Sequence, residues 1–347
     1  APTHARGRMM RAWILKEQAR VEERPLKLAE VPAPHAQGDE IRVKVVACGV
    51  CRTDIHIAEG DLPLRKSPII PGHEIVGVVD EVGGDVQRFN EGDRVGAYWL
   101  HSSCGTCKYC LSGRENYCPE IRCTGWDRDG GYAEYVTVPA AYALPLNDVQ
   151  MDGLEIAPLM CPGIAGYAAF KLAAVQEGDR LGLYGFGPTA YCVLKVAQAQ
   201  GIEVYVSTRS QENIESAKRE GAHWAANTAK EEMPCKLDAA ILFPPAGSLV
   251  EPILAQLERG GILVMAPVSA TPIAIEDYSA NLWGRDIRTL YNLSRSDAEE
   301  FFDIVDQLDL KVGTSVFSFG ELQDALILVK QGKLHQPNAV IEIAVSA

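Results

Sequence analysis

Four cysteines occur close together within 101–120, in a C-x2-C-x2-C-x7-C pattern formed by Cys104, Cys107, Cys110 and Cys118. Four thiolates supply the tetrahedral coordination of a structural zinc ion, and the short spacing lets one loop surround that ion. An iron–sulfur cluster also takes four thiolates at similar spacing, so this interpretation stays open. The array predicts a metal-binding lobe, with zinc as the favoured ion.

A second group of possible metal ligands lies upstream. The stretch "ACGVCRTDIHIAEG" (47–60) contains Cys51, Thr53 and His56, and "PGHEIVGVVDEVGGDV" (71–86) contains His73 and Glu74. Cysteine and histidine are common zinc ligands, and hydroxyl and imidazole groups can move protons. Taken alone, the first stretch could be a polar turn after a strand at 40–50, and His73–Glu74 could be a polar pair beside a strand.

A glycine-rich turn in the middle of the chain indicates a nucleotide. Within "RLGLYGFGPTAYCVLKVAQAQGIEVYVSTRS" (180–210), Gly185, Gly187 and Ala190 form G-x-G-x-x-A between an expected strand and helix, the setting of a dinucleotide fingerprint. The second expected strand ends without the acid that usually binds a ribose in NAD sites. The end of that strand carries Ser207, Thr208, Arg209 and Ser210. Arginine can bind a 2′-phosphate, so NADP(H) is favoured over NAD(H), the alternative being a solvated loop.

Composition narrows the class of protein. The chain has 347 residues, 47% hydrophobic and 23% charged, with a formal charge of −13. That charge argues against nucleic acid or an anionic membrane as the main partner, and it leaves a small-molecule substrate or other proteins as possible partners. The ten cysteines occur without an apolar export signal or a run of about 20 apolar residues, which predicts reduced thiols and a cytoplasmic protein.

Taken together, the motifs resemble the zinc-dependent alcohol dehydrogenases of the medium-chain dehydrogenase/reductase superfamily, over nearly the whole chain. The resemblance implies a catalytic zinc held by Cys51, His73 and Cys161, the last in "APLMCPGIAGY" (157–167). The fourth zinc position would stay open for substrate or water. The resemblance also implies that Glu74 is an accessory residue at the metal and that Asp54 orients the histidine ring.

The resemblance further implies a reaction and its contacts. Zinc would acidify an alcohol, and Thr53 would pass the proton through a cofactor ribose to His56. Implied cofactor contacts are Arg52, Ala266 and Val268. Trp99, Ile57 and Trp126 are possible pocket walls, which would favour small or flat primary alcohols and aldehydes, although each could be simple core packing. We also expect a homodimer or homotetramer.

An α/β fold follows from the same resemblance. A doubly wound Rossmann domain is expected at 156–294, and a β-rich, barrel-like (GroES-like) catalytic domain at 1–155 and 295–347. Within the Rossmann domain, the periodicity predicts a helix over 248–260 that ends at Gly260 and Gly261. No task is assigned to Cys48, Cys123, Cys192 and Cys235, for which buried free thiols are expected.

Two other functions compete with an alcohol dehydrogenase. A polyol or sugar-alcohol dehydrogenase could use the same scaffold, although some of these lack the four-cysteine lobe. The other alternative is a non-catalytic protein that retains zinc and nucleotide. It is disfavoured because the sequence has the complete set of Cys51, Thr53, His56, His73 and Cys161. The physiological substrate and the preferred direction have no signature in the sequence.

Overall fold

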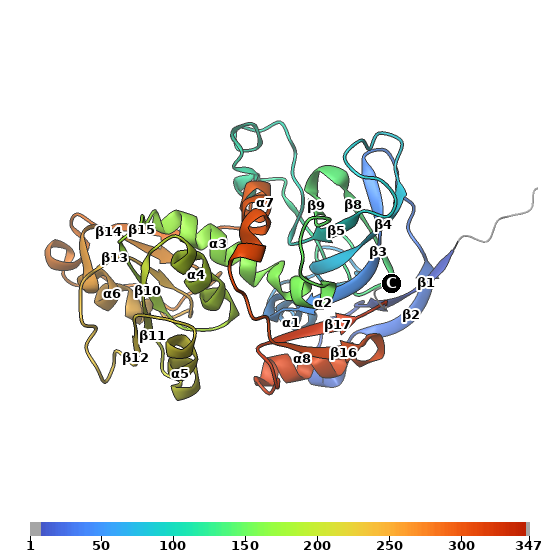
Figure 1. Ribbon diagram of the computed structural model, residues 1–347. Coiled ribbons are helices and arrows are strands. Elements are labelled where there is room, and N and C mark those ends of the chain that lie inside the picture. Colours follow the sequence, from blue (N-terminus) through green and yellow to red (C-terminus); the bar gives the residue numbers. More distant parts are fainter. Residues whose placement is uncertain (1–7, 345–347) are drawn as a thin grey trace, which may run out of the picture. The chain divides into compact units, whose positions relative to one another are not determined.

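The computed structural model describes residues 8–344. The chain forms two compact units (Figure 1). Unit 1 contains the chain up to Cys161, Leu293–Asp306 and the chain from Lys311 onward, and unit 2 contains Pro162–Asn292 and Gln307–Leu310. Unit 1 is therefore built from both ends of the chain.

Unit 1 is rich in β-structure. A seven-stranded sheet has the order β16-β17-β3-β4-β5-β9, with β8 also paired to β3, and β1-β2 and β6-β7 form two smaller sheets. The strands are β1 (Met9–Ile14), β2 (Lys27–Pro32), β3 (Glu40–Val50), β4 (Glu74–Val82), β5 (Arg94–Ala97), β6 (Leu100–Ser102), β7 (Arg122–Cys123), β8 (Tyr135–Pro139), β9 (Leu144–Pro145), β16 (Thr314–Ser318) and β17 (Asn338–Glu342). The helices are α1 (Arg52–Glu59), α2 (Gly153–Ile156), α7 (Arg295–Ile304) and α8 (Leu322–Gln331).

The central strand β3 explains why this unit holds together. It pairs antiparallel with β4, β8 and β17 along different parts of its length. Its apolar side chains Ile41, Val43 and Val45 are buried in one hydrophobic core with residues from β1, β4 and α8. Burial of such side chains contributes about 1.5–3 kcal/mol each, so this strand anchors the elements on either side of it.

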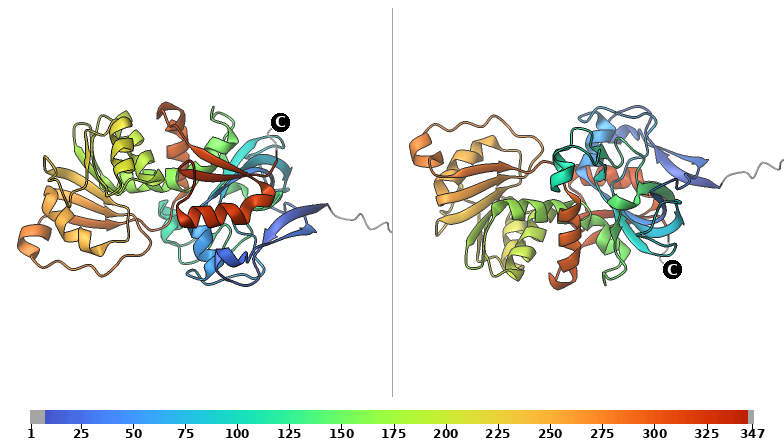
Figure 2. Two further views of the ribbon diagram at one scale, coloured as in Figure 1. Left: turned by 90° about the horizontal axis from the view of Figure 1, so that it is seen from below. Right: turned by 90° about the horizontal axis from the view of Figure 1, so that it is seen from above.

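Unit 2 is a parallel six-stranded sheet in the order β12-β11-β10-β13-β14-β15. Counted from β10 as first strand, this is the 3-2-1-4-5-6 order of a doubly wound nucleotide-binding fold. The strands are β10 (Arg180–Tyr184), β11 (Glu203–Ser207), β12 (Trp224–Ala226), β13 (Leu237–Leu242), β14 (Leu257–Met265) and β15 (Asp286–Thr289). The helices are α3 (Pro162–Ala173), α4 (Pro188–Ala199), α5 (Gln211–Arg219) and α6 (Val250–Gln256), and Figure 2 shows them beside the sheet.

One predicted boundary in unit 2 is wrong. The helix expected to reach Gly260 ends at Gln256, and the chain enters β14 at Leu257. Leu257 is fully buried and pairs with Leu237 of β13. Sheet pairing and burial therefore override the helical pattern of 257–260.

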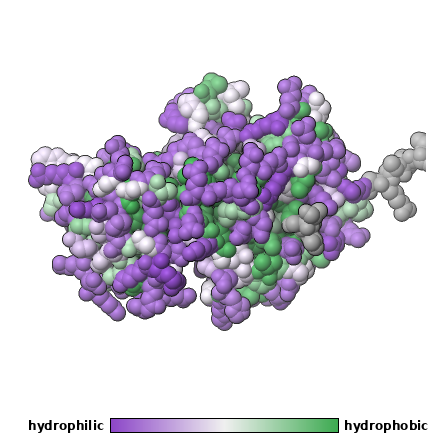
Figure 3. Space-filling model, in the orientation of Figure 1, coloured by the Kyte–Doolittle hydropathy of each residue, from purple (hydrophilic) through white to green (hydrophobic). Residues whose placement is uncertain are grey.

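The displayed surface is mainly hydrophilic, with smaller apolar areas between the polar residues (Figure 3). Among the described residues, no single helix has the length and apolar character needed to cross a membrane, and only Gly153–Leu159 taken together with Pro162–Ala173 across a sharp bend passes that test.

Candidate metal centres and active site

The ends of β3 and β4 bring the first set of metal-ligand residues together. Gly49 of β3 lies opposite Glu74 of β4, so the residues that follow β3 and precede β4 meet at one edge of the sheet. Cys51 follows β3, His73 precedes β4, and Cys161 comes at the end of the chain segment after α2. One ligand atom from each of Cys51, His73, Glu74 and Cys161 lies within 4.8 Å of the others.

Cys51 is fixed by the start of helix α1. It is the N-cap of the helix, and its sulfur accepts the backbone N–H of Thr53 at 3.5 Å. Asp54 completes a capping box by accepting the backbone N–H of Cys51 at 2.9 Å. After the end of β3, residues 52–59 of this stretch therefore form a capped helix, and the alternative of a simple polar turn is wrong.

His73 leaves one ring nitrogen free for a ligand. Its Nδ1 lies 3.1 Å from Oδ1 of Asp54, while its buried Nε2 has no hydrogen-bond partner. A carboxylate at Nδ1 fixes the N–H there and directs the Nε2 lone pair outward. A buried polar group without a hydrogen-bond partner lowers the stability of a fold by about 1–3 kcal/mol. A ligand bound to Nε2 would remove this cost.

A metal fits this donor set. Two sulfurs, an imidazole and a carboxylate are common zinc ligands, and the sulfurs of Cys51 and Cys161 lie 3.9 Å apart. Cys51, His73 and Cys161 would hold the ion, with Glu74 beside it. The position of Glu74 also explains Gly49, because a side chain at 49 would overlap the Glu74 carboxylate.

The electrostatics of the cluster suit a cation. A hydrogen bond from Cys161 holds the pKa of Cys51 well below its ordinary value despite burial, while the same bond raises the pKa of Cys161. Burial acts against a charged His73, but the Asp54 carboxylate outweighs it and raises the pKa of the imidazole. Burial and the nearby Cys51 raise the pKa of Glu74. The anionic forms of Cys161 and Glu74 are thus disfavoured beside Cys51, and a cation bound among these side chains would relieve that repulsion.

Asp54 is held by a residue that the sequence did not single out. Its side chain is almost fully buried, and its Oδ2 accepts the Tyr132 hydroxyl at 2.8 Å. Burial and the Asp54 charge raise the pKa of Tyr132, so this hydroxyl stays a donor. No local pattern around Tyr132 could have indicated this contact, because the two residues are 78 positions apart.

The expected proton-relay residues lie on α1. Thr53 and His56 are three residues apart, which places them on one side of the helix. The Thr53 hydroxyl lies 3.6 Å from the Cys51 sulfur, and His56 Nδ1 lies 2.7 Å from Asp61 Oδ2. His56 is partly exposed, which suits the solvent end of a relay. Arg52, the first residue of α1, is exposed.

The four-cysteine array also converges. The sulfurs of Cys104, Cys107, Cys110 and Cys118 all lie within 4.8 Å of one another. Hydrogen bonds from the Thr106 backbone and hydroxyl lower the pKa of Cys104 to about 6, whereas burial raises the pKa of Cys118 to about 11. Four sulfurs in this arrangement fit a closed tetrahedral site.

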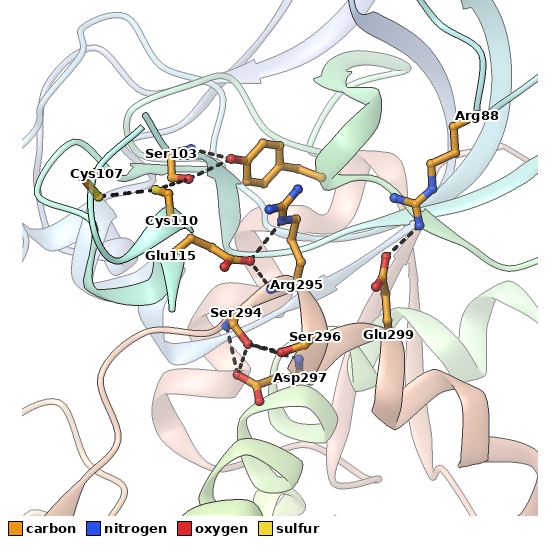
Figure 4. Close-up of polar contacts among 11 residues, drawn as sticks. Arg88, Ser103, Cys107, Cys110, Glu115, Ser294, Arg295, Ser296, Asp297 and Glu299 are labelled. Carbon is orange, nitrogen blue, oxygen red and sulfur yellow. Dashed lines mark hydrogen bonds and ion pairs between the residues drawn. The ribbon is translucent and has the colours of Figure 1, made fainter. Parts of the chain in front are cut away.

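Polar contacts attach this lobe to the rest of unit 1 (Figure 4). The Ser103 hydroxyl lies 3.2 Å from the Cys110 sulfur and 2.8 Å from the Tyr142 hydroxyl. Glu115 Oε1 accepts the backbone N–H of Arg295 at 2.9 Å and its Nε at 3.0 Å. The lobe is thereby fixed to the start of α7.

The glycine-rich turn of unit 2 has the geometry of a phosphate-binding turn. Gly185 has a φ of 94°, which favours glycine, and Gly187 is the N-cap of α4 without a capping side chain. Pro188 occupies the first turn of α4, and Ala190 is buried. The N–H groups at the start of α4 therefore remain available for a pyrophosphate.

The expected ribose-binding residues differ in their availability. The Ser207 hydroxyl lies 2.7 Å from that of Thr228, and the Ser210 hydroxyl caps α5 by accepting the backbone N–H of Asn213. Thr208 is buried, whereas Arg209 is exposed after β11. Arg209 is thus the charged group at this strand end with a free surface.

Comparison with known proteins assigns the family. The chain is 44% identical over 331 residues to the probable alcohol dehydrogenase AdhA of Mycobacterium tuberculosis, covering 94% of this chain and 95% of that protein. The chain belongs to the zinc-dependent alcohol dehydrogenase family. Residues 37–148 match the alcohol dehydrogenase GroES-like domain. An alcohol dehydrogenase of Geobacillus stearothermophilus is 34% identical over 90% of this chain and 94% of its own.

Solved structures agree with this family. A cinnamyl alcohol dehydrogenase from Sorghum bicolor is 26% identical, with a TM-score of 0.86 over 98% of this chain and 99% of its own. A cobalt- and zinc-bound alcohol dehydrogenase from Pyrobaculum aerophilum shares the fold at 24% identity, with a TM-score of 0.84 over 97% of this chain and all of its own. The expected α/β fold, with a GroES-like part and a Rossmann sheet, is confirmed. The protein is an oxidoreductase of this family.

In this alcohol dehydrogenase, the predicted pocket residues occupy different surroundings. Trp99 is half-buried, and its ring meets the His73 ring edge-on with centroids 5.2 Å apart. Trp126 stacks on Trp99 at 5.8 Å. Ile57 is fully buried in the core of unit 1, so its burial supports core packing.

The structure of this alcohol dehydrogenase also gives the exposure of the remaining predicted positions. Ala266 is half-buried just after β14, and Val268 is 99% exposed. The unassigned Cys48, Cys123 and Cys192 are buried, and burial raises the pKa of each thiol. Cys235 is partly buried. All ten cysteines are free thiols.

Proposed function

We propose that this alcohol dehydrogenase binds two zinc ions per chain and transfers hydride between a small or flat primary alcohol and NADP⁺, and in reverse from NADPH to an aldehyde. The observation that carries the catalytic part is the unpartnered Nε2 of His73, a residue that lies in one cluster with Cys51 and Cys161. The four converging sulfurs of the lobe support the second ion.

The residues of the catalytic centre have separate tasks in this proposal. Zinc, when bound, polarises the substrate oxygen and makes its hydroxyl proton more acidic. Cys51, His73 and Cys161 hold the ion, and Asp54 keeps the His73 ring in one orientation. Glu74, whose pKa burial raises, lies beside the ligands as an accessory group.

Thr53 and His56 move the proton. The Thr53 hydroxyl, close to the Cys51 sulfur, accepts the proton from the substrate hydroxyl and releases its own toward His56. His56 can pass the proton to solvent because its side chain is 44% exposed, and its Nδ1 lies 2.7 Å from Asp61 Oδ2. The position of Thr53 and His56 on the same side of α1 supports proton transfer from the first residue to the second.

Preference for NADP(H) rests on Arg209. The strand end after β11 has an exposed arginine and no acid within Ser207–Ser210. A guanidinium binds a 2′-phosphate through paired charge-assisted hydrogen bonds, which a ribose hydroxyl cannot match. Gly185, Gly187 and Ala190 would admit the pyrophosphate at the start of α4, with Arg52, Ala266 and Val268 as further contacts.

The protein also forms homodimers or homotetramers in this proposal. Strand β15 is an edge of the parallel sheet, and its backbone groups on one side have no neighbouring strand among the described residues. Exposed large apolar side chains gather in the same part of unit 2: Val268, Ile273, Tyr278, Trp283, Ile287 and Tyr291. An open edge beside such residues favours pairing with a second copy. The ten free thiols support a reducing, cytoplasmic location.

The test combines metal content with turnover. Zinc is measured in the purified protein, and oxidation of a short alcohol series is followed with NAD⁺ and NADP⁺, before and after chelation and zinc restoration. About two zinc ions per chain and turnover that chelation removes and zinc restores would support the proposal. Two zinc ions without turnover on any alcohol or aldehyde would leave a zinc- and nucleotide-binding protein instead. Fastest turnover of bulky secondary alcohols would refute the proposed substrate class.

A further inference from the structure

A line of contacting side chains leads from His73 through Trp99 and Trp126 to Arg65, whose side chain is 46% exposed. The Trp99 ring meets His73 at an interplanar angle of 78°, and Trp126 stacks on Trp99 at 24°. Trp99 is half-buried. A substrate bound beside His73 would therefore meet an indole wall that is one side of a two-ring stack.

Trp126 is held from two other directions. Its indole N–H donates to the carbonyl oxygen of Pro63 at 2.9 Å. The guanidinium carbon of Arg65 lies 3.5 Å from the centre of its ring, a close cation–π contact. The indole N–H fixes the edge of Trp126, and Arg65 covers its ring.

Arg65 is itself fixed by a carboxylate. Its Nη1 lies 3.1 Å from Oδ2 of Asp127, the residue directly after Trp126. That oxygen also accepts the backbone N–H of Cys123 at 2.8 Å, and the Asp127 side chain is only 8% exposed. The anchor of Arg65 is therefore rigid, although Arg65 is partly exposed.

We propose that Arg65 is a positioning residue for substrate selection, which holds Trp126 against Trp99 and so keeps the indole wall beside His73 in place. This inference rests on the proposed function, because it assigns the wall to the pocket of that site. The flat wall favours planar, unsaturated or aromatic alcohols, since offset stacking rewards a flat partner. Arg65 acts through Trp126, whose ring it covers, and not through a direct contact in the pocket.

The test compares Arg65→Met with Arg65→Lys and with a matched control. Methionine keeps an unbranched chain but removes the charge and the planar donor group, whereas lysine keeps the charge. The control is Arg88→Met, because Arg88 also lies over an aromatic ring, that of Phe89, and pairs with Glu299. The Arg88–Glu299 pair is shown in Figure 4.

Three readouts are expected to separate positioning from general stability. For Arg65→Met, the KM for benzyl alcohol rises about threefold relative to ethanol, with kcat and zinc content close to wild type. The exciton-coupled circular dichroism of the Trp99–Trp126 pair weakens. Arg65→Lys lies between wild type and Arg65→Met, and Arg88→Met matches wild type.

Unchanged dichroism and an unchanged benzyl alcohol to ethanol ratio in Arg65→Met would overturn the inference. Failure of the proposed function looks different, because wild-type protein would then show no chelator-sensitive turnover. In that case, benzyl alcohol binding is followed by tryptophan fluorescence, and equal affinity of wild type and Arg65→Met would still overturn the role of Arg65.

Discussion

Glu115 in the cysteine lobe and Arg295 at the start of α7 form a two-point contact across 180 residues of sequence. The Glu115 side chain is 3% exposed, and it accepts both the backbone N–H and the Nε of Arg295. The Arg295 guanidinium also lies over the Tyr142 ring. Because Tyr142 contacts Ser103 beside the Cys110 sulfur, the lobe and α7 share one polar network.

Glu115→Gln tests the contribution of this contact to stability. We expect the free energy of unfolding to fall by about 1–3 kcal/mol, because a charge-assisted contact of a buried carboxylate is lost. Glu299→Gln is the matched control, since its pair with Arg88 is exposed and is expected to cost less than about 1 kcal/mol. Urea denaturation of both variants measures the difference, and equal losses would contradict the prediction.

The same pair predicts a pH dependence. Burial acts to raise the pKa of Glu115, but hydrogen bonds and charge from Arg295 outweigh it, and the pKa lies below the ordinary 4.5. A carboxyl group whose pKa is lower in the folded than in the unfolded state stabilises the fold at pH values above its unfolded pKa. This contribution is lost as the pH falls through the folded pKa. The stability gap between wild type and Glu115→Gln should therefore be full at pH 7 and shrink below about pH 4.5. A gap of constant size down to pH 3 would argue against the ion pair.

Asp54→Asn tests the orientation of His73. The neutral amide accepts the Nδ1 hydrogen of His73 less strongly than the carboxylate does and fixes the ring less well, so affinity for the catalytic zinc should fall about 10–100-fold. The lobe should keep its own ion, because its sulfurs are separate from Asp54. Zinc release against a graded chelator series measures this, with Asp324→Asn, an exposed surface aspartate paired with Arg24, as control. Equal release from both variants would remove the role of Asp54.

Cys107→Ser should change the metal content rather than the chemistry. Serine is a weaker zinc ligand than a thiolate, so zinc should fall from about two ions to about one per chain. The melting temperature should fall as well, because a closed metal site contributes directly to folding. Cys235→Ser is the control, since Cys235 belongs to neither cluster. Two retained ions in Cys107→Ser would count against a four-thiolate site.

Arg209→Gln tests the cofactor preference. Loss of charge-assisted hydrogen bonds to a 2′-phosphate should raise the KM for NADP⁺ about 10–100-fold while leaving that for NAD⁺ nearly unchanged. Arg219→Gln, at the exposed end of α5, should leave both values at wild-type level. Parallel changes for the two cofactors in Arg209→Gln would show that the residue does not recognise the phosphate.

Local sequence patterns predict much of this molecule. The alternating stretch 40–50 coincides with β3, and the G-x-G-x-x-A spacing coincides with the turn before α4. Both follow from short-range rules of side-chain alternation and backbone freedom. The end of α6 could not be predicted in this way, because the pairing of Leu257 with Leu237 depends on the assembled sheet.

Around the candidate metal ligands, too, local motifs could be predicted and long-range contacts could not. The positions of Cys51 and His73 could be predicted from their motifs, whereas the Tyr132 hydroxyl on Asp54 joins residues 78 positions apart. Arg65 on Trp126 and Arg295 on Glu115 are equally non-local. Such contacts leave no periodic or spaced pattern in the sequence, so only the folded chain reveals them.

The pairing of β17 with β3 has a consequence for the order of events during protein synthesis. Ala339 lies opposite Val50 in this pairing, so the central strand gains this neighbour only after all the residues between positions 50 and 339 have been synthesised. The strands of unit 2 lie within one continuous segment and can assemble earlier. During translation, the edge of β3 that precedes Cys51 therefore stays open until residues 338–342 emerge, and an open strand edge can pair with another newly made chain.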